Sequence, residues 1–254
     1  MTTFHQRIDQ LPVEIHPTND ALGMAAAQSA IATLKTAIDI RGQANVILAT
    51  GNSQLSLFAG LRQAGDLDWS RVNVFHMDEY VGITDQHPAS FPRFLRERIL
   101  GQLNPGAFYP INGAAPSLEQ ECARYAALLR QHPADLCCLG YGENGHIAFN
   151  DPPFAEFNDP LWVKVVRLAE ASRRQQVGEG HYPTLADVPT HAITLTIPAL
   201  LAAKRLLCIV PERRKAAAVK AALTGPITED CPGSILRTVP HATLYLDAES
   251  ASLL

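Results

Sequence analysis

Several hallmarks of other protein classes are missing from this 254-residue sequence. No apolar run approaches the ~20 residues that a membrane-spanning helix needs, and residues 1–7 lack the apolar core of a secretory signal peptide. The formal net charge is −4, and no basic stripe occurs that would support nucleic-acid binding. We therefore expect a cytoplasmic protein whose partner is neither a membrane nor a nucleic acid.

Cysteine is also sparse, and its placement argues against disulfides and metals. The five residues are Cys122, Cys137, Cys138, Cys208 and Cys231. Their number is odd and one adjacent pair sits inside an apolar run, which is typical of buried free thiols rather than of a disulfide framework. No pair has the spacing of a structural zinc site. The sequence therefore predicts no metal, and nothing in it calls for a cofactor.

What the chain does have is an ordinary globular composition, with 47% hydrophobic and 18% charged residues. Short apolar runs predict buried strands at 46–49, 72–75, 136–139, 206–210 and 242–246. Two more alternating runs, at 163–166 and 192–196, are interpreted as strands nearer an edge. Helical patterns lie between them at 19–40, 53–62, 91–100, 118–129 and 213–223, the first capped by Thr18 or Asn19.

This alternation of strands and helices predicts the fold class. Short links between the two favour a doubly wound, mostly parallel sheet with helices on both faces, a Rossmann-like three-layer α/β sandwich. Without a repeat or a low-complexity linker, residues 1–254 are predicted to form a single domain. The segment 152–189 is the least regular, and we interpret it as containing a mobile flap over a site.

The first candidate site is a polar turn between a strand and a helix. Thr50, Gly51, Asn52 and Ser53 follow the run 46–49 directly. Backbone N–H groups, hydroxyls and a helix N-terminus at the carboxyl edge of a parallel sheet suit a phosphate, although an ordinary capped turn has the same sequence. Neither a GxGxxG fingerprint nor a Walker A loop is present, so a nucleotide is not indicated.

The second candidate is the pair of carboxylates Asp78 and Glu79, at the end of the strand that begins at residue 72. Because strand side chains alternate between faces, only one of the two is expected to enter a given pocket. A partly buried carboxylate there suits a general base, and a solvated turn with a helix cap is an equally good interpretation of this motif alone.

The third candidate follows the strand 136–139, where glycines lead into Asn144, Gly145, His146 and Asp151. Glycines allow a ligand to approach the backbone closely, and a histidine moves protons near neutral pH. Asp151 could orient the imidazole, with Asn144 in the same network. A lone histidine is more often structural, but this setting favours a catalytic one.

The fourth candidate is Lys215, in the first turn of a helix that follows the strand 206–210. A lysine at that position works against the helix dipole, a small cost that a bound anion would relieve. By itself, a solvated lysine is the better interpretation.

Together these motifs resemble the glucosamine-6-phosphate deaminase family, within the wider group of sugar-phosphate isomerases and 6-phosphogluconolactonases. The resemblance runs from about residue 46 to 246. It is most specific in the segments 77–82, 87–90, 145–150 and 231–236. It implies an enzyme that isomerises and deaminates glucosamine 6-phosphate to fructose 6-phosphate and ammonia, with a small-molecule amino-sugar phosphate as its partner.

The resemblance also implies roles for the candidate residues. Asp78 matches the proton acceptor for enolisation, and His146 the histidine that opens the sugar ring. Asn144 and Asp151 match two positions that assist this histidine. The turn Thr50–Ser53, with Gly145 and Lys215, matches the groups that bind the substrate and its phosphate. The sequence is silent on oligomeric state and compatible with a homo-oligomer.

The chain departs from the family pattern in three places. Asn144 stands where an aspartate is frequent, and Asp151 stands where a glutamate is usual. The region 173–182 lacks the family's phosphate-binding arginine, whose place by spacing falls near Glu179. Arg173, Arg174 and His181 are the candidate substitutes. A 6-phosphogluconolactonase or another sugar-phosphate isomerase, and a non-catalytic sugar-phosphate sensor, remain alternative interpretations.

Overall fold

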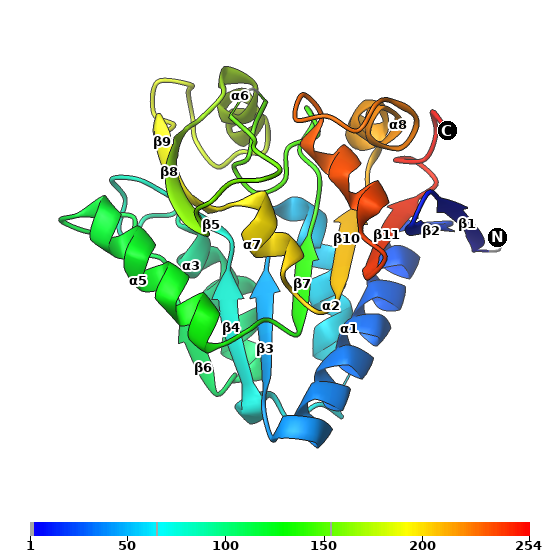
Figure 1. The fold of residues 1–254 in the computed structure, drawn as a ribbon, viewed down its shortest axis with the longest axis horizontal. Helices are drawn as coiled ribbons and strands as arrows, with labels where there is room; N and C mark the ends of the chain where they lie inside the picture. Colours follow the sequence, from blue (N-terminus) through cyan, green and yellow to red (C-terminus); the bar gives the residue numbers. More distant parts are fainter. Residues whose placement is uncertain (1–2, 65, 153) are drawn as a thin grey trace.

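The computed structural model describes residues 3–64, 66–152 and 154–254, and its centre is an eight-stranded sheet (Figure 1). In spatial order the strands are β1 (Phe4–Ile8), β2 (Leu11–His16), β11 (Ala242–Asp247), β10 (Leu206–Val210), β7 (Leu136–Leu139), β3 (Ala44–Leu48), β4 (Val72–His76) and β6 (Ala107–Tyr109). Neighbouring strands of this sheet are parallel, except that β1 and β2 form an antiparallel hairpin. The predicted doubly wound, mostly parallel α/β fold is confirmed.

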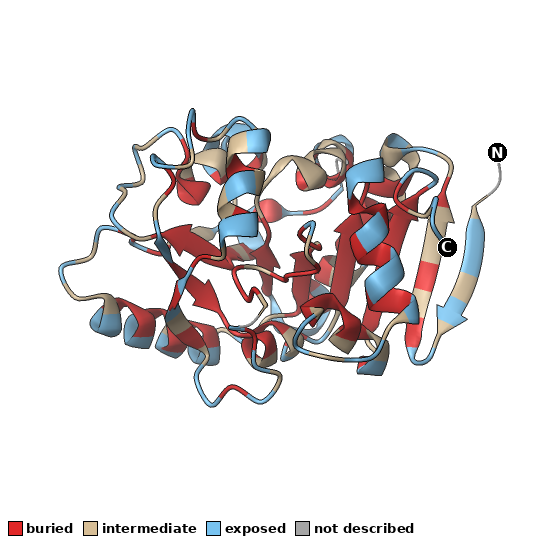
Figure 2. Ribbon diagram, turned by 90° about the horizontal axis from the view of Figure 1, so that it is seen from above, coloured by how far each residue is buried: buried red, intermediate tan, exposed pale blue. Residues whose placement is uncertain are grey.

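Helices cover both faces of the sheet because its strands are apolar on both sides. One face carries α1 (Asn19–Arg41), α2 (Leu55–Gln63) and α3 (Phe91–Leu95), and the other carries α5 (Leu118–Gln131), α7 (Ile197–Leu201) and α8 (Ala216–Thr224). Within β3, Val46 and Leu48 join the apolar cluster on the first face and Ile47 joins the cluster on the second. Figure 2 shows the buried strands between helices whose outer surfaces are exposed.

The helix boundaries agree closely with the sequence patterns. Thr18 caps α1, since its side chain accepts a hydrogen bond from the backbone N–H of Ala21 at 3.1 Å. The pattern at 91–100 is divided between α3 and a π-helical turn at Arg96–Leu100, which continues into α4 (Gly101–Leu103). A 3₁₀ helix lies at Pro232–Thr238. The strands β1, β2 and β6 and the helix α7 have no counterpart among the predicted elements.

The strands predicted at 163–166 and 192–196 are confirmed, but they do not belong to the main sheet. β8 (Val163–Arg167) and β9 (His191–Leu195) form a separate antiparallel sheet with β5 (Asp78–Tyr80), in the order β5-β9-β8. A single residue, Met77, separates β4 from β5, so the chain leaves the main sheet there and pairs elsewhere. This departure fixes the position of Asp78, which pairs with Thr194.

The irregular segment 152–189 includes β8 and one further helix, α6 (Glu170–Gly178). Figure 1 shows α6 above the carboxyl ends of the central strands. Residue 153 of this segment lies outside the described residues. That the segment acts as a mobile flap stays a prediction, as does the single-domain interpretation.

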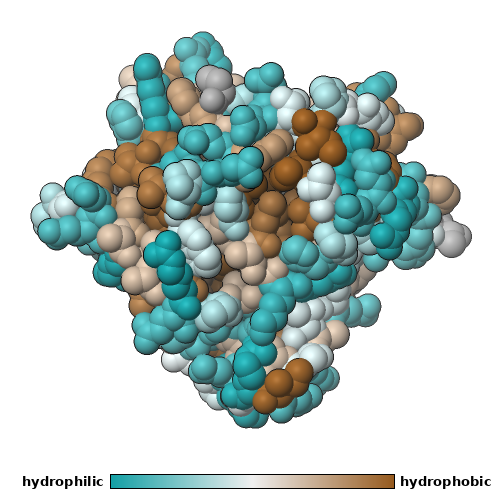
Figure 3. Space-filling view, viewed as in Figure 1, coloured by the Kyte–Doolittle hydropathy of each residue, from teal (hydrophilic) through white to brown (hydrophobic). Residues whose placement is uncertain are grey.

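The surface is mixed in character. Figure 3 shows apolar side chains gathered in patches over the upper part of one face, with polar side chains between them. Within the part of the chain that the structure describes, no helix combines the length and apolar character required to cross a bilayer.

Candidate active site

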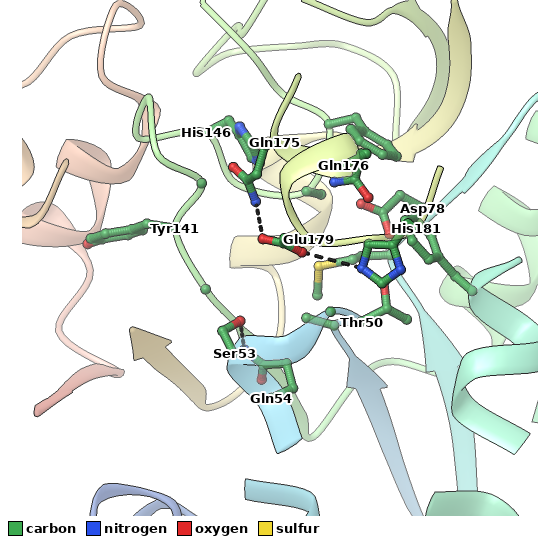
Figure 4. A pocket seen from close by; sticks show the side chains of 18 of the residues that line it. Thr50, Ser53, Gln54, Asp78, Tyr141, His146, Gln175, Gln176, Glu179 and His181 are labelled. Carbon is green, nitrogen blue, oxygen red and sulfur yellow. Dashed lines mark hydrogen bonds and ion pairs between the residues drawn. The ribbon is translucent and has the colours of Figure 1, made fainter. Parts of the chain in front are cut away.

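A pocket of about 610 Å³, including the part open to solvent, lies at the carboxyl edge of the main sheet (Figure 4). Its walls include the residues that follow β3, β4 and β7, together with α6. The strand order reverses between β3 and β7, because β4 and β6 extend to one side and β10 and β11 to the other. Such a switch point is where open α/β sheets bind ligands.

The turn after β3 forms the floor of the pocket. Thr50, Gly51 and Ser53 line it, whereas Asn52 does not. Gly51 has a φ of 100°, which a residue with a side chain rarely adopts, and it precedes a 3₁₀ turn at Asn52–Gln54 that leads into α2. The backbone therefore presents the start of a helical segment to the pocket, an arrangement that favours an anion.

Asp78 lies in the pocket wall and is 6% exposed. Its Oδ1 atom is buried and has no hydrogen-bond partner among the described residues, so it is available to a ligand. Burial raises the pKa of Asp78 well above its ordinary value, and the neighbouring charge of Glu79 raises it further. A carboxylate in this environment is a stronger base than one in water.

Glu79 points to the other face of β5 and does not line the pocket, as the alternation of a strand requires. Its carboxylate accepts hydrogen bonds from Ser90 Oγ at 2.7 Å and from the backbone N–H of Tyr80 at 2.8 Å. Burial raises the pKa of Glu79 to about 7, although these hydrogen bonds oppose the shift.

His146 lines the pocket, and its Nδ1 atom faces a polar cluster formed by Asn144, Asp151 and Ser172. Nδ1 is 2.6 Å from Asn144 Oδ1, 3.0 Å from Asp151 Oδ1 and 3.1 Å from Ser172 Oγ. The side-chain contacts of this ring among the described residues all use Nδ1, which leaves Nε2 for the pocket. Asn144 and Asp151 stand behind the histidine rather than in the pocket lining.

Asp151 is completely buried, and its carboxylate is held by several donors. Asn144 Nδ2 donates a hydrogen bond to it at 3.0 Å, and Ser172 Oγ donates another. Burial would raise the pKa of Asp151, but the contact with His146 and these hydrogen bonds outweigh burial and lower it. Asp151 is therefore a stable anion beside the imidazole, as in an orienting carboxylate.

The glycines after β7 make room for the histidine. A Cβ atom at Gly142 would lie 2.0 Å from Cε1 of His146, so no side chain fits there while the ring keeps its place. Gly145 does not line the pocket, and a Cβ there would lie 2.9 Å from the Sγ atom of Cys231. Its carbonyl accepts a hydrogen bond from the backbone N–H of Gly233 at 2.8 Å.

Lys215 closes the pocket on the side of β10 and is 2% exposed. It makes no ion pair within 4 Å among the residues that the structure describes. Burial lowers its pKa, although the nearby charge of Glu179 acts in the opposite direction. A buried, unpaired lysine beside the Thr50–Gly51 turn is a ready site for an anion.

No group of three or more histidine, cysteine, aspartate or glutamate side chains within residues 3–64, 66–152 and 154–254 is arranged to hold a metal ion.

Comparison with known proteins shows the family of this chain. The family described as glucosamine-6-phosphate isomerases/6-phosphogluconolactonase matches residues 17–245. The chain belongs to this family. Proteins named glucosamine-6-phosphate deaminase from Bacillus cereus (strain B4264) and Bacillus thuringiensis (strain Al Hakam) are each 40% identical over 206 residues, which is 81% of this chain and 76% of theirs.

Solved structures show the same fold. The structure of a monomeric glucosamine-6-phosphate deaminase is 31% identical, with a TM-score of 0.88 over 95% of this chain and 99% of that one. A 6-phosphogluconolactonase from Trypanosoma brucei has a TM-score of 0.76 over 99% of this chain and all of its own, but only 18% identity, so it bears on the fold alone.

The structure separates the three residues considered as substitutes for the family's arginine. Arg173 donates hydrogen bonds to the backbone carbonyls of Leu185 and Val188, and Arg174 pairs with Glu170 on the surface. Of the three, only His181 lines the pocket, where its Nε2 atom is 3.4 Å from Oε2 of Glu179.

Sequence reasoning missed the polar face of α6. Ser172, Gln175, Gln176 and Glu179 are spaced at i, i+3, i+4 and i+7, so they share one side of the helix and its end. Gln175, Gln176 and Glu179 line the pocket, and Ser172 reaches His146 and Asp151. This spacing was the available signal, but a polar face on a helix usually indicates solvent.

We expect Ser172→Ala to raise the pKa of Asp151, because the carboxylate loses a buried hydrogen-bond donor. Carbon-13 NMR titration of the Asp151 carboxyl measures the shift. Ser172→Thr keeps the hydroxyl and should leave the titration near that of the unchanged protein. An unaltered or lowered pKa in the alanine variant would contradict this account of the cluster.

Proposed function

We propose that this chain is a cytosolic enzyme that isomerises and deaminates glucosamine 6-phosphate, yielding fructose 6-phosphate and ammonia. The carrying observation is that a buried carboxylate, Asp78, and an oriented histidine, His146, line the same pocket. One group can move a proton between neighbouring carbons while the other moves a proton between oxygens. Membership of the family and the 40% identity to named deaminases support this assignment.

Binding begins with the phosphate. The Thr50–Ser53 turn and Lys215 supply N–H groups, hydroxyls and a buried positive charge on one side of the pocket. Asp78 and His146 are other members of the same lining, so a phosphate held at the turn brings the sugar toward both. Such positioning can contribute ~7–11 kcal/mol at best in well-oriented systems.

Ring opening is assigned to His146. Its Nδ1 atom is held by Asn144 and Asp151, which leaves Nε2 to take the proton of the anomeric hydroxyl and deliver it to the ring oxygen. The bond between C1 and the ring oxygen breaks, and C1 becomes an aldehyde. The Asp151 carboxylate stabilises the imidazolium that forms between the two transfers.

Isomerisation is assigned to Asp78. Its carboxylate removes the proton from C2 while the C1 carbonyl oxygen takes a proton from the substrate's ammonium group, which gives an enolamine. Asp78 returns its proton to C1, and the double bond now joins C2 to nitrogen. Water adds to C2, the bond between C2 and nitrogen breaks as ammonia leaves, and the ketose phosphate remains. The raised pKa of Asp78 helps this step, because proton abstraction from carbon needs a base stronger than an ordinary carboxylate.

A substrate assay tests the reaction. We expect the purified protein to release ammonia and fructose 6-phosphate from glucosamine 6-phosphate in equal amounts. Galactosamine 6-phosphate and 6-phosphogluconolactone are offered in parallel. If neither amino sugar releases ammonia, the deaminase proposal is wrong. If only the lactone reacts, releasing acid, the chain is a lactonase.

Asp78→Asn should reduce kcat by ~10²–10⁴-fold, since it removes the general base. Exchange of the C2 proton with deuterated solvent, followed by proton NMR, should be lost while inorganic phosphate still binds. Asp85→Asn is the control, because Asp85 is an exposed partner of Arg96. Continued exchange in the Asp78 variant would show that another group is the base.

The acid limb of the pH profile should move to lower pH in Glu79→Gln. The rate rises as Asp78 loses its proton, and the charge of Glu79 is one of the two causes that raise the pKa of Asp78. Removing that charge lowers the pKa of Asp78, so the base is ionised at lower pH. The dependence of kcat/KM on pH measures this, and a shift to higher pH is incompatible with it.

A further inference from the structure

A second carboxylate lies in the pocket, and the proposed reaction gives it no role. Glu179 follows directly after the last residue of α6 and lines the pocket. Its Oε1 atom accepts hydrogen bonds from Gln175 Nε2 and from Arg214 Nη1, both at 2.9 Å. Its Oε2 atom is 3.4 Å from His181 Nε2. Figure 4 shows the carboxylate between Gln175 and His181, on the side of the pocket where Thr50 lies.

This carboxylate is an anion with little access to solvent. The side chain is 6% exposed. Burial would raise the pKa of Glu179, but the hydrogen bond from His181 and the charges of Arg214 and Lys215 outweigh burial and lower it to about 2. The charge that stabilises it therefore comes from cationic side chains around the pocket.

The place of Glu179 coincides with the proposed phosphate subsite. Its Oε2 atom is 3.9 Å from the position that a Cβ atom would take on Gly51, in the middle of the phosphate-binding turn. Lys215, which has no ion pair of its own among the described residues, contributes to the field that stabilises the carboxylate. A dianionic phosphate bound at this turn would meet a fixed negative charge while Glu179 stays in place.

We propose that Glu179 is a specificity-determining residue that occupies the phosphate subsite of the free enzyme as an internal anion, so that the substrate's phosphate binds by displacing it. The inference rests on the proposed function, because it assumes that an anionic group of the substrate occupies this subsite. Once Glu179 moves out, Lys215 and His181, which line the pocket, are available to the phosphate. Arg214 does not line the pocket and keeps its ion pairs with Glu212 and Glu143. His181 then replaces the family's arginine at this subsite.

The surroundings of Glu179 allow this movement. It is flanked by Gly178 and Gly180, and a Cβ atom added to either would meet no other atom within 4 Å. Gly180 has a φ of 80°, so the backbone turns sharply just after Glu179. The backbone on either side of Glu179 therefore has room to shift when the side chain leaves the pocket.

The opposite role is the main rival. Glu179 could hold Arg214 and His181 in the geometry that binds phosphate, in which case it would aid binding. The two roles predict opposite signs for the same substitution. The change in phosphate affinity distinguishes the two roles, and measuring it does not require the enzyme to turn over a substrate.

Isothermal titration calorimetry of the full chain with inorganic phosphate measures that affinity. We expect Glu179→Gln and Glu179→Ala to bind phosphate ~10–100-fold more tightly, as when a competing state that occupies 90–99% of the free protein is removed. Glu170→Gln is the matched control, because Glu170 lies on the same helix but pairs with Arg174 on the surface. Its affinity should be unchanged.

A double variant locates the effect. Glu179→Gln combined with Lys215→Ala should lose the gain, because Lys215 belongs to the same subsite. Equal affinity in wild type and both Glu179 variants, weaker binding in those variants, a gain that survives the loss of Lys215, or no detectable binding in any protein would each overturn the proposal.

Ammonia release from glucosamine 6-phosphate is measured on the same proteins, so failure of the reaction is seen separately from failure of the inference. Tighter phosphate binding by the Glu179 variants without ammonia release in wild type would refute the deaminase assignment and keep Glu179 as an internal anion. Ammonia release by wild type, with no change in phosphate affinity or in KM in the Glu179 variants, would support the deaminase assignment and refute the role of Glu179 as an internal anion.

Discussion

The site depends on the divergence of the chain after two neighbouring parallel strands, β3 and β7. After β3 the chain enters α2 on one face of the sheet, and after β7 it continues toward the Gly142–His146 loop beside the opposite core. Neither connection can fill the space between them at the carboxyl edge. Polar groups that would be costly inside the sheet can therefore lie there and face a ligand.

The helix α6 contacts both the His146–Asp151 side of the pocket and the side formed by the Thr50–Ser53 turn. Ser172 contacts the buried pair His146 and Asp151, and the other end of the helix brings Glu179 against the phosphate turn. The side chain of Gln175 also accepts a hydrogen bond from the backbone N–H of Glu143, in the loop after β7. A shift of α6 at one end is thus felt by groups that serve proton transfer and by groups that surround the phosphate.

Features created by residues close together in the sequence could be predicted, and features created by contacts between distant segments could not. The five central strands of the main sheet were evident because both faces are apolar, whereas β1, β2 and β6, which are only partly buried, were missed. The turns at 50–53 and 142–146 were evident because parallel strands deliver their carboxyl ends to one edge. The small sheet was missed since its first strand, Asp78–Tyr80, is three residues long and its pairing with Ala192–Thr194 is set by tertiary contacts. Ser172 was missed for the same reason, because only the folded chain brings it to Asp151.

Two aspartates in this site experience opposite environments, and this difference separates their roles. Asp78 has a buried oxygen that finds no hydrogen-bond partner in the described part of the chain, and a like charge lies beside it, so its carboxylate is poorly stabilised and basic. Asp151 accepts hydrogen bonds from Asn144 and Ser172 beside His146, so its carboxylate stays ionised and is a weak base. When two titratable groups in one site have pKa values shifted in opposite directions, they can take different roles in acid–base catalysis. Asp78 is accordingly suited to take a proton from carbon, and Asp151 to hold a charged histidine without taking its proton.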